Sequence, residues 1–445
     1  MDKAVCPTCR VLRQRIAELE AQLEAALRAG KRQAGPFSKG QPKKRPKKPG
    51  RKPGPDYGTK AQRPPPEHID ETLEAPLPDV CPDCGGPVVQ TEVRQQFQVE
   101  IPRQPIQRRF DVHIGCCRRC HGRVQGRHPL QTSDALGAAA SQLGADVQAA
   151  LVDLNKNAGL SHGKISQVLR NLFGIRLSKS GVAHVILRAG RRCHKVYQGL
   201  CQALPRSAWV VPDETGWRVG GQPAWLHGLV TPQATAYVID PTRSGQVAEQ
   251  LLGRDYAGVM IHDGWSPYDN FLHARHQQCL AHLLRRCREM LHMAGRGAGR
   301  FPRQIHDRLQ AALSLRDRHA AGQISDHGLA VARGRLQQSL HGLIANYKQD
   351  AGNERLAAHL WKHQDQLWTF LKHPGLDATN WRAELAMRFG VILRKVWGGN
   401  RTWAGAFAQA ALMSVWRTCW QQGRNAIDFL SQLLRGQPAL LAMPP

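Results

Sequence analysis

The chain of 445 residues lacks the features of a membrane or secreted protein. It has no apolar run of about 18 residues, which a membrane-spanning helix requires, and it opens with no signal peptide. Its twelve cysteines occur mostly in Cys-x-x-Cys pairs or singly, without the dense spacing of a disulfide framework. We therefore expect a cytoplasmic protein whose cysteines bind metal or remain thiols.

Acidic residues are scarce relative to basic ones. The 34 aspartates and glutamates oppose 62 lysines and arginines, so the formal net charge is +28. A charge of this size attracts polyanions, and nucleic acid is the usual polyanionic partner of a protein without membrane segments. With 42% hydrophobic residues, the chain can build a sizeable core, divided over roughly two to four domains.

Two aspartates follow apolar runs that are typical of buried strands. Asp213 comes directly after residues 208–212 (Ala-Trp-Val-Val-Pro), and Asp263 directly after residues 258–262 (Gly-Val-Met-Ile-His). We expect each carboxylate to project from the polar end of its strand. Glu384 lies far downstream, inside a helical pattern. The alternative is that each aspartate is a turn or helix-cap residue.

Three carboxylates in this order are a candidate metal site. Their oxygens are hard ligands that suit magnesium or manganese. Two such ions activate a water or a 3′ hydroxyl and stabilise the leaving oxygen in phosphodiester cleavage. The spacing is compatible with a ribonuclease-H-like sheet that carries Asp213 and Asp263, a helical insertion over about 283–375, and a helix that supplies Glu384.

Two cysteine pairs predict a structural zinc ribbon over 66–130. Each pair has a two-residue gap, and together they supply the four thiolates of a closed tetrahedral shell: Cys81, Cys84, Cys117 and Cys120. Residues 96–101 and 109–114 alternate apolar and polar side chains like short strands. We assign Cys116 to packing, because only Cys117 preserves the gap.

The segment 1–30 has apolar positions spaced alternately by four and three, the seam of a short coiled coil: Leu12, Ile16, Leu19, Leu23 and Ala26. This pattern predicts self-association, and its alternative is one amphipathic helix packed on its own protein. Cys6 and Cys9 are half of a zinc site at most, and we interpret them as free thiols.

The segment 31–65 is a basic linker, rich in proline and glycine, with Asp56 as its one acid. It has too few large apolar side chains for a packed core, so we expect a disordered arm. The arm would bind DNA phosphates through its basic side chains, among them Lys43, Lys44, Arg45, Lys47, Lys48, Arg51 and Lys52. A merely solubilising tail is the alternative.

Residues 131–204 follow a helical pattern. Ser161 and Ser178 are suited to begin two helices, and Gly174 is suited to end the first. Two helices joined by a short turn are similar to a helix-turn-helix reader of DNA, with basic side chains on the second helix: Lys179, Arg188 and Arg191. An ordinary hairpin that braces the catalytic domain fits equally well.

Cys279 and His282 lie on a helical segment just after Asp263. Their spacing of three places both side chains on one helix face. A soft thiolate is a poor ligand for magnesium, so we expect these residues to support the acids or to position DNA. A packing histidine is the alternative.

The residues around the three acids read Asp213-Glu214-Thr215-Gly216-Trp217, Asp263-Gly264-Trp265-Ser266-Pro267-Tyr268 and Thr379-Asn380-Trp381-Arg382-Ala383-Glu384. These words resemble the three catalytic blocks of the insertion sequence 66 family of DDE transposases. The resemblance extends through Arg394-Lys395-Val396-Trp397-Gly398-Gly399-Asn400, where it implies further DNA-binding positions at Arg394 and Lys395. The chain departs from the family at Trp381 and Leu385, where family members commonly have asparagine and a polar residue.

The resemblance implies a multidomain bacterial transposase, in which a coiled coil, a zinc ribbon and a helical region precede a ribonuclease-H-like catalytic domain at 205–425 and a tail at 426–445. Its triad Asp213, Asp263 and Glu384 would use Mg²⁺ or Mn²⁺ to cut DNA and transfer 3′ ends, with Zn²⁺ structural. Partners would be the inverted-repeat ends and target DNA, further copies of the chain and accessory proteins, at the nucleoid. The alternatives are an inactive or domesticated DNA-binding protein, and a nuclease without strand transfer.

Overall fold

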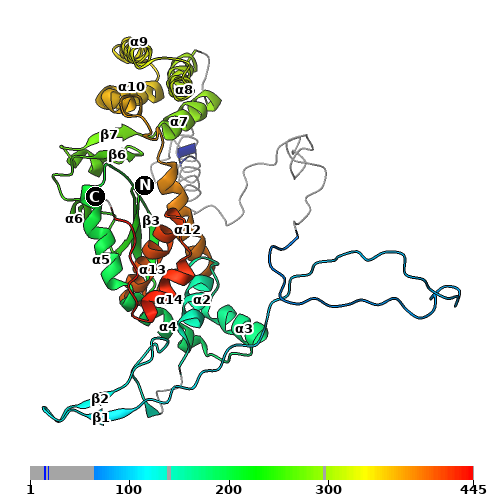
Figure 1. Ribbon diagram of the computed structural model, residues 1–445. Coiled ribbons are helices and arrows are strands. Elements are labelled where there is room, and N and C mark those ends of the chain that lie inside the picture. The colour runs from blue at the N-terminus through cyan, green and yellow to red at the C-terminus, as the bar shows by residue number, and fades with distance from the viewer. Residues whose placement is uncertain (1–14, 17–18, 20–64, 138–141, 294–296, 444–445) are drawn as a thin grey trace, which may run out of the picture. The chain divides into compact units, whose positions relative to one another are not determined.

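The computed structural model describes residues 15–16, 19, 65–137, 142–293 and 297–443 (Figure 1). The chain divides into two units, 1–102 and 103–445. Nearly all of the expected coiled coil and basic linker lies outside the described residues, together with Cys6, Cys9 and the expected arm residues Lys43, Lys44, Arg45, Lys47, Lys48, Arg51 and Lys52. Both segments stay predictions.

Within the first unit, residues 65–102 have little regular structure. Val80 and Pro87 form an isolated antiparallel bridge. The strand expected at 96–101 is absent, and the prediction was wrong there, because Phe97, Val99 and Ile101 stay exposed and no neighbouring strand supplies hydrogen bonds. In the second unit, the strand expected at 109–114 is displaced: β1 (Ile114–Cys116) pairs antiparallel with β2 (Arg123–Gln125).

A five-stranded sheet organises the second unit. Its spatial order is β5-β4-β3-β6-β7. Antiparallel pairs join β3 (Trp209–Val219), β4 (Gln222–Val230) and β5 (Thr235–Asp240), whereas β6 (Val259–His262) and β7 (Arg275–Gln278) run parallel to β3. The strands predicted from the apolar runs before Asp213 and Asp263 are confirmed as β3 and β6, and β7 was not expected.

Alternation along the strands gives the sheet two buried faces. Val211 and Ile261 belong to the core shared with α7 (Leu280–Met293), α8 (Arg300–Ala320) and α12 (Trp381–Trp397). Val210 and Met260 belong to the core shared with α6 (Gln246–Leu252), η3 (Leu204–Arg206) and η4 (Ser266–Asn270). Because successive side chains of a strand point to opposite faces, neighbours in sequence enter different cores.

Helices fill the chain between β7 and α12, the segment expected to be an insertion. After α7 and α8 come α9 (Asp326–Ile344), α10 (Ala351–His363), η5 (Gln364–Leu367) and α11 (Thr369–Lys372). Their apolar faces extend the core that contains Val211, through residues such as Ile305, Leu340 and Leu360. Figure 1 shows these helices beyond the β6 and β7 end of the sheet.

A second group of helices forms its own core: α2 (Ala145–Lys156), α3 (His162–Phe173), α4 (Lys179–Arg192), α5 (His194–Ala203), α13 (Trp403–Gln421) and α14 (Ala426–Leu434). Ser161 and Ser178 accept the N-terminal N–H groups of Lys164 and Gly181, and Gly174 ends α3 at φ 68°, as expected. None of the described helices combines the length and apolar character that a membrane crossing requires.

Helix α13 completes the hydrogen bonding of β5. The N–H of Tyr237 donates to Ser414 Oγ at 2.8 Å, and the N–H of Thr235 donates to Thr418 Oγ1 at 3.1 Å. The two hydroxyls donate in turn to Ala410 O and Thr235 O. Backbone groups of a buried strand need such partners, so these hydroxyls join the sheet to the helical core.

We expect Ser414→Ala and Thr418→Val to destabilise the protein by about 1–3 kcal/mol each, because each leaves a buried N–H without an acceptor. Chemical denaturation followed by circular dichroism measures the change. Ser314→Ala on the exposed surface of α8 is the control. Equal midpoints for all three variants and the unsubstituted protein would contradict this account of the β5 edge.

Candidate active site

The register of β3 and β6 brings Asp213 and Asp263 to matching positions. Trp209 pairs with Val259 and Val210 with Met260, so each aspartate follows its paired residue by the same number of positions. Both aspartates share the strand face of Val211 and Ile261, which α12 covers. The expectation for Asp213 needs one correction: it lies inside β3, because pairing with β4 continues beyond it as far as Val219.

Glu384 reaches the same region from the first turn of α12. Two close approaches hold this helix against the sheet. A Cβ on Gly228, the β4 residue opposite Asp213, would lie 2.5 Å from Met387 Sδ, so the Met387 side chain of α12 packs directly over this glycine. One turn from the other end of the helix, Arg394 donates to Gly216 O and, at 3.4 Å, to Thr215 Oγ1.

The three carboxylates interact electrostatically. Burial first, and then the charges of Glu214, Asp263 and Glu384, raise the pKa of Asp213 to about 7, against one N–H bond from Glu214 to Asp213 Oδ1 at 2.9 Å that lowers it. Negative charge gathered in a partly buried place favours protonation or a bound cation. The donor set therefore fits Mg²⁺ or Mn²⁺.

Among the described residues, no group of three or more His, Cys, Asp or Glu side chains is drawn together closely enough to hold a metal ion. Asp213, Asp263 and Glu384 therefore interact through their charges without forming such a group. The cysteine pairs in the described part of the chain likewise form no group that could hold a metal ion.

Cys279 and Asn380 join the two ends of the helical insertion. Cys279 Sγ donates to Asn380 Oδ1 at 3.1 Å, the N–H of Asn380 donates back to Cys279 Sγ at 3.4 Å, and the N–H of Leu280 donates to Ala378 O at 3.0 Å. Asn380 is also the N-cap residue of α12. Cys279 therefore lies behind Glu384 and fixes the start of its helix.

His282 lies one turn after Cys279, with Nε2 3.7 Å from Glu384 Oε1. Its Nδ1 is buried without a hydrogen-bond partner among the described residues. The structure thus brings Cys279 and His282 beside Asn380 and Glu384, but the expectation that both lie on the helix was wrong for Cys279, which directly precedes α7.

A chain of histidines supports the turn at Asp263. The N–H of Gly264 donates to His262 Nδ1 at 3.2 Å, so the proton of His262 lies on Nε2, which donates to His276 Nδ1 at 3.0 Å. His276 Nε2 then donates to Phe271 O at 3.0 Å. Burial, followed by His276, lowers the pKa of His262 to about 3 and keeps it neutral.

Gly264 itself has φ +94°, and a Cβ there would lie 2.7 Å from Gln278 Oε1. The next residue, Trp265, donates its N–H to Asp263 Oδ1 at 3.0 Å. Only glycine allows the chain to turn this closely to β7, so the turn presents the exposed Asp263 in one defined orientation.

No role at the site was assigned to Glu214 from the sequence. Its side chain faces away from Asp213 across the sheet, where Arg243 donates Nε and Nη2 to Glu214 Oε1 at 3.0 and 2.8 Å. Tyr268 donates its hydroxyl to Glu214 Oε2 at 3.0 Å. The only signal for it in the sequence was a second acid directly after Asp213, within the motif that resembles the first catalytic block of the family.

Two expected DNA-binding residues follow one another on α12 and differ in their surroundings. Arg394 is partly buried and braces α12 against β3, whereas Lys395 is exposed. The following glycine-rich turn docks on the same strand: Trp217 Nε1 donates to Asn400 Oδ1 at 2.9 Å, and a Cβ on Gly399 would lie 2.3 Å from Arg218 O.

The expected reader residues Lys179, Arg188 and Arg191 are exposed on α4. The opposite face of this helix is buried: Val182, Val185 and Ile186 enter the core of the helical group. A Cβ on Gly190 would lie 2.6 Å from Ala408 Cβ, which records how closely α4 and α13 approach. The helix therefore braces α13 and also presents a basic face.

The two expected zinc pairs each form a turn of the same kind. In the first, Gly85 donates to Cys81 O at 2.8 Å and Cys81 donates to Gly86 O at 2.9 Å. In the second, His121 and Cys117 repeat both bonds at 2.9 Å, the latter to Gly122 O.

Both turns also polarise their first thiol. Backbone N–H groups lower the pKa of Cys81, Asp83 first and then Cys84, and they lower the pKa of Cys117, Cys120 first and then Arg119. N–H groups directed at sulfur suit thiolate ligands. His121 has φ 54° at the position of Gly85, which makes it strained for a residue with a side chain.

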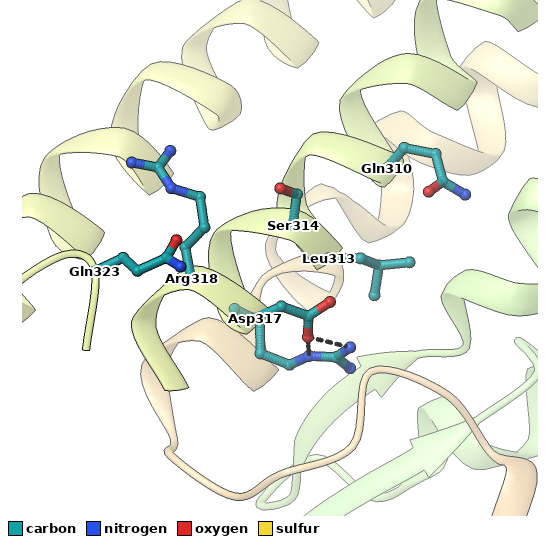
Figure 2. A pocket seen from close by; sticks show the side chains of 7 residues that line it. Gln310, Leu313, Ser314, Asp317, Arg318 and Gln323 are labelled. Carbon is teal, nitrogen blue, oxygen red and sulfur yellow. Dashed lines mark hydrogen bonds and ion pairs between the residues drawn. The ribbon is translucent and has the colours of Figure 1, made fainter. Parts of the chain in front are cut away.

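A hollow of about 420 Å³ lies on α8, away from the acids. Figure 2 shows its largely polar lining, which includes Gln310, Ser314 and Asp317. Asp317 is paired with Arg316, which also lines the hollow. It has no partner carboxylates beside Asp317 and no buried polar group directed into it, so it is not the candidate active site.

One family model, described as "Transposase IS66 family", matches residues 140–408. This range is more than half of the chain and includes Asp213, Asp263 and Glu384. No curated protein matches the chain.

The raised pKa of Asp213 predicts how stability depends on pH in the absence of metal. An unfolded aspartate titrates near about 3.9. Between that value and about 7 the folded state binds the extra proton, so this residue lowers stability as the pH rises, by up to about 1.4 kcal/mol per unit. We expect Asp213→Asn to raise the unfolding temperature more at pH 8 than at pH 5.

Thermal unfolding in EDTA at the two pH values measures this difference. Asp307→Asn, on the exposed side of α8, is the control and should shift neither value. The same gain from Asp213→Asn at both pH values would mean that its carboxyl is not protonated in the folded state.

Proposed function

Because the chain belongs to the IS66 family of transposases, we propose that it is a DDE-type enzyme that cuts DNA and joins the resulting 3′ ends to a target. The observation that carries the proposal is the electrostatic coupling of Asp213 to Asp263 and Glu384 across β3, β6 and α12. The strand order, with three antiparallel strands followed by two parallel ones, supports a ribonuclease-H-like catalytic domain.

Asp213, Asp263 and Glu384 would hold Mg²⁺ or Mn²⁺ through their carboxylate oxygens. A bound metal would act as a Lewis acid, which would make water or a 3′ hydroxyl more nucleophilic and stabilise the leaving oxygen. Asp213 must be ionised to bind a cation, and its raised pKa places that ionisation close to neutral pH. The proton leaves as the cation binds.

The surrounding residues set the positions of the acids. The histidine chain from Gly264 to Phe271 holds the Asp263 turn, and the Cys279–Asn380 contact holds the start of the Glu384 helix. His282 beside Glu384 is placed to orient this carboxylate. These supports would bring acids from three distant segments toward one another.

DNA binding would involve three further regions. The exposed basic face of α4, with Lys179, Arg188 and Arg191, would contact element ends, and Lys395 would contact DNA near the acids. The arm at 31–65 would bind phosphates, and its affinity would fall as the salt concentration rises. The cysteine turns would hold one structural Zn²⁺ in a ribbon over 66–130, with the described polarised thiols as ligands.

We expect Asp213→Ala, Asp263→Ala and Glu384→Ala each to reduce cleavage below detection and to leave DNA affinity nearly unchanged, because metal ligands are lost and the basic surface is not. A duplex copied from the DNA that flanks the gene is the substrate. The unsubstituted enzyme should work with Mg²⁺ or Mn²⁺ and poorly with Ca²⁺. Asp307→Ala is the control, and cleavage at its rate by any of the three variants would remove that residue from the triad.

Native mass spectrometry should find one Zn²⁺ per chain. Cys81→Ser and Cys120→Ser should each lose the ion together with the hydrogen-exchange protection of residues 75–128, because structural zinc contributes folding free energy. Cys116→Ser is the matched control and should keep the ion. A chain without zinc, or a Cys81→Ser variant that retains it, would disprove the ribbon.

A further inference from the structure

Two arginines near the acids have the same unusual surroundings. The Arg243 guanidinium lies 5.1 Å from the Trp225 ring centroid and 5.0 Å from that of Trp265. The Arg382 guanidinium lies 5.4 Å from Trp209 and 4.8 Å from Trp381. Each cation is therefore associated with two indole rings, an arrangement that restricts the orientation of a long, flexible side chain.

A carboxylate anchors each guanidinium from one side. Glu214 accepts Nε and Nη2 of Arg243, and Asp377 accepts Nε of Arg382 at 2.5 Å. Within the described part of the chain, Nη1 of Arg243 and both Nη groups of Arg382 have no protein acceptor. The anchored planes thus keep N–H donors for another partner, and these side chains remain 46% and 39% exposed.

The two assemblies lie beside different acids. Glu214 follows Asp213 in β3, and Trp265 donates its N–H to Asp263, so Arg243 is attached to the neighbours of both aspartates. Arg382 lies two residues before Glu384 on α12. Strand alternation puts the Glu214 side chain on the opposite sheet face from Asp213, whereas Arg382 lies over Trp209 on the face of Asp213.

Neutralising a buried acid explains only part of this arrangement. The Glu214 side chain is 4% exposed and needs a positive partner, but that need is met by any cation that reaches it. The Asp377 side chain is partly exposed, at 24%, and needs no such partner, yet its arginine has the same two indoles. The shared element is an oriented, partly exposed guanidinium.

We propose that Arg243 and Arg382 bind backbone phosphates of DNA on either side of the three carboxylates. A planar guanidinium with free N–H donors matches the oxygens of a phosphate diester, and orienting it in advance reduces the entropy lost on binding. The proposal rests on the proposed function, since it takes the strand to be cut as the occupant of this surface.

The test measures DNA affinity against salt concentration in EDTA, where no cleavage occurs, with a fluorescein-labelled duplex copied from the DNA that flanks the gene. Each lost phosphate contact reduces the slope of log affinity against log salt by about 0.9. Arg243→Gln and Arg382→Gln should each show this reduction. Arg254→Gln is the matched control: Arg254 pairs with Glu249 in the same way but is 81% exposed, and it should leave the slope unchanged.

Two double variants separate phosphate binding from charge neutralisation. Glu214→Gln with Arg243→Gln, and Asp377→Asn with Arg382→Gln, remove each ion pair as a whole and leave no unpaired acid. If the arginines bind phosphate, the double variants keep the reduced slope although their thermal stability recovers. Slopes equal to that of the unsubstituted protein in both double variants would overturn the proposal.

Arginine modification tests the unsubstituted protein directly. Phenylglyoxal followed by peptide mass spectrometry should show that the duplex protects Arg243 and Arg382 but not Arg254, and equal reactivity of all three with and without DNA would also overturn the proposal. Failure of the proposed function looks different: the unsubstituted protein would then neither prefer the flanking duplex nor cut it with Mg²⁺, before any arginine is changed.

Discussion

The candidate active site depends on the closure of the helical insertion. The chain leaves the sheet at Cys279 and returns at Asn380, and hydrogen bonds between these two residues, with a third from Leu280 to Ala378, bring the ends together. The entropic cost of closing a loop rises only slowly with its length. The helices between the two ends also pack on one another, and this packing offsets the cost of closure. Glu384 follows Asn380 by one helical turn, so its position beside the aspartates is set by this contact.

The sequence could predict the features that depend on neighbouring residues alone, such as where a helix begins and ends. The helix ends at Ser161, Gly174 and Ser178 were correct because capping depends on a residue and its next few neighbours. Strand β7 was missed because Arg275–Gln278 has no apolar pattern. Its buried amide Gln277 finds partners at Leu367 and Phe370, far along the chain, which no local pattern reveals.

The site was predictable in its acids and not in their surroundings. Asp213 and Asp263 stand out because apolar runs precede them, yet the run before Asp213 could not show that β4 extends its strand as far as Val219. The spacing of Cys279 and His282 predicted a shared helix face, but Cys279 precedes α7, and its contact with Asn380 could be found only from the fold. The two arginine assemblies were unforeseen, because Arg243 lies over indoles from two other segments and Arg382 lies over the remote Trp209.

The hydroxyls that α13 places against β5 also protect an edge of the sheet. A sheet edge with free N–H and C=O groups is a template for edge-to-edge aggregation and strand exchange. At Thr235 and Tyr237 the outward groups already bond to Thr418 and Ser414. This edge strand therefore offers no free N–H group at Thr235 or Tyr237 to a strand of another molecule, which closes these positions to β-aggregation.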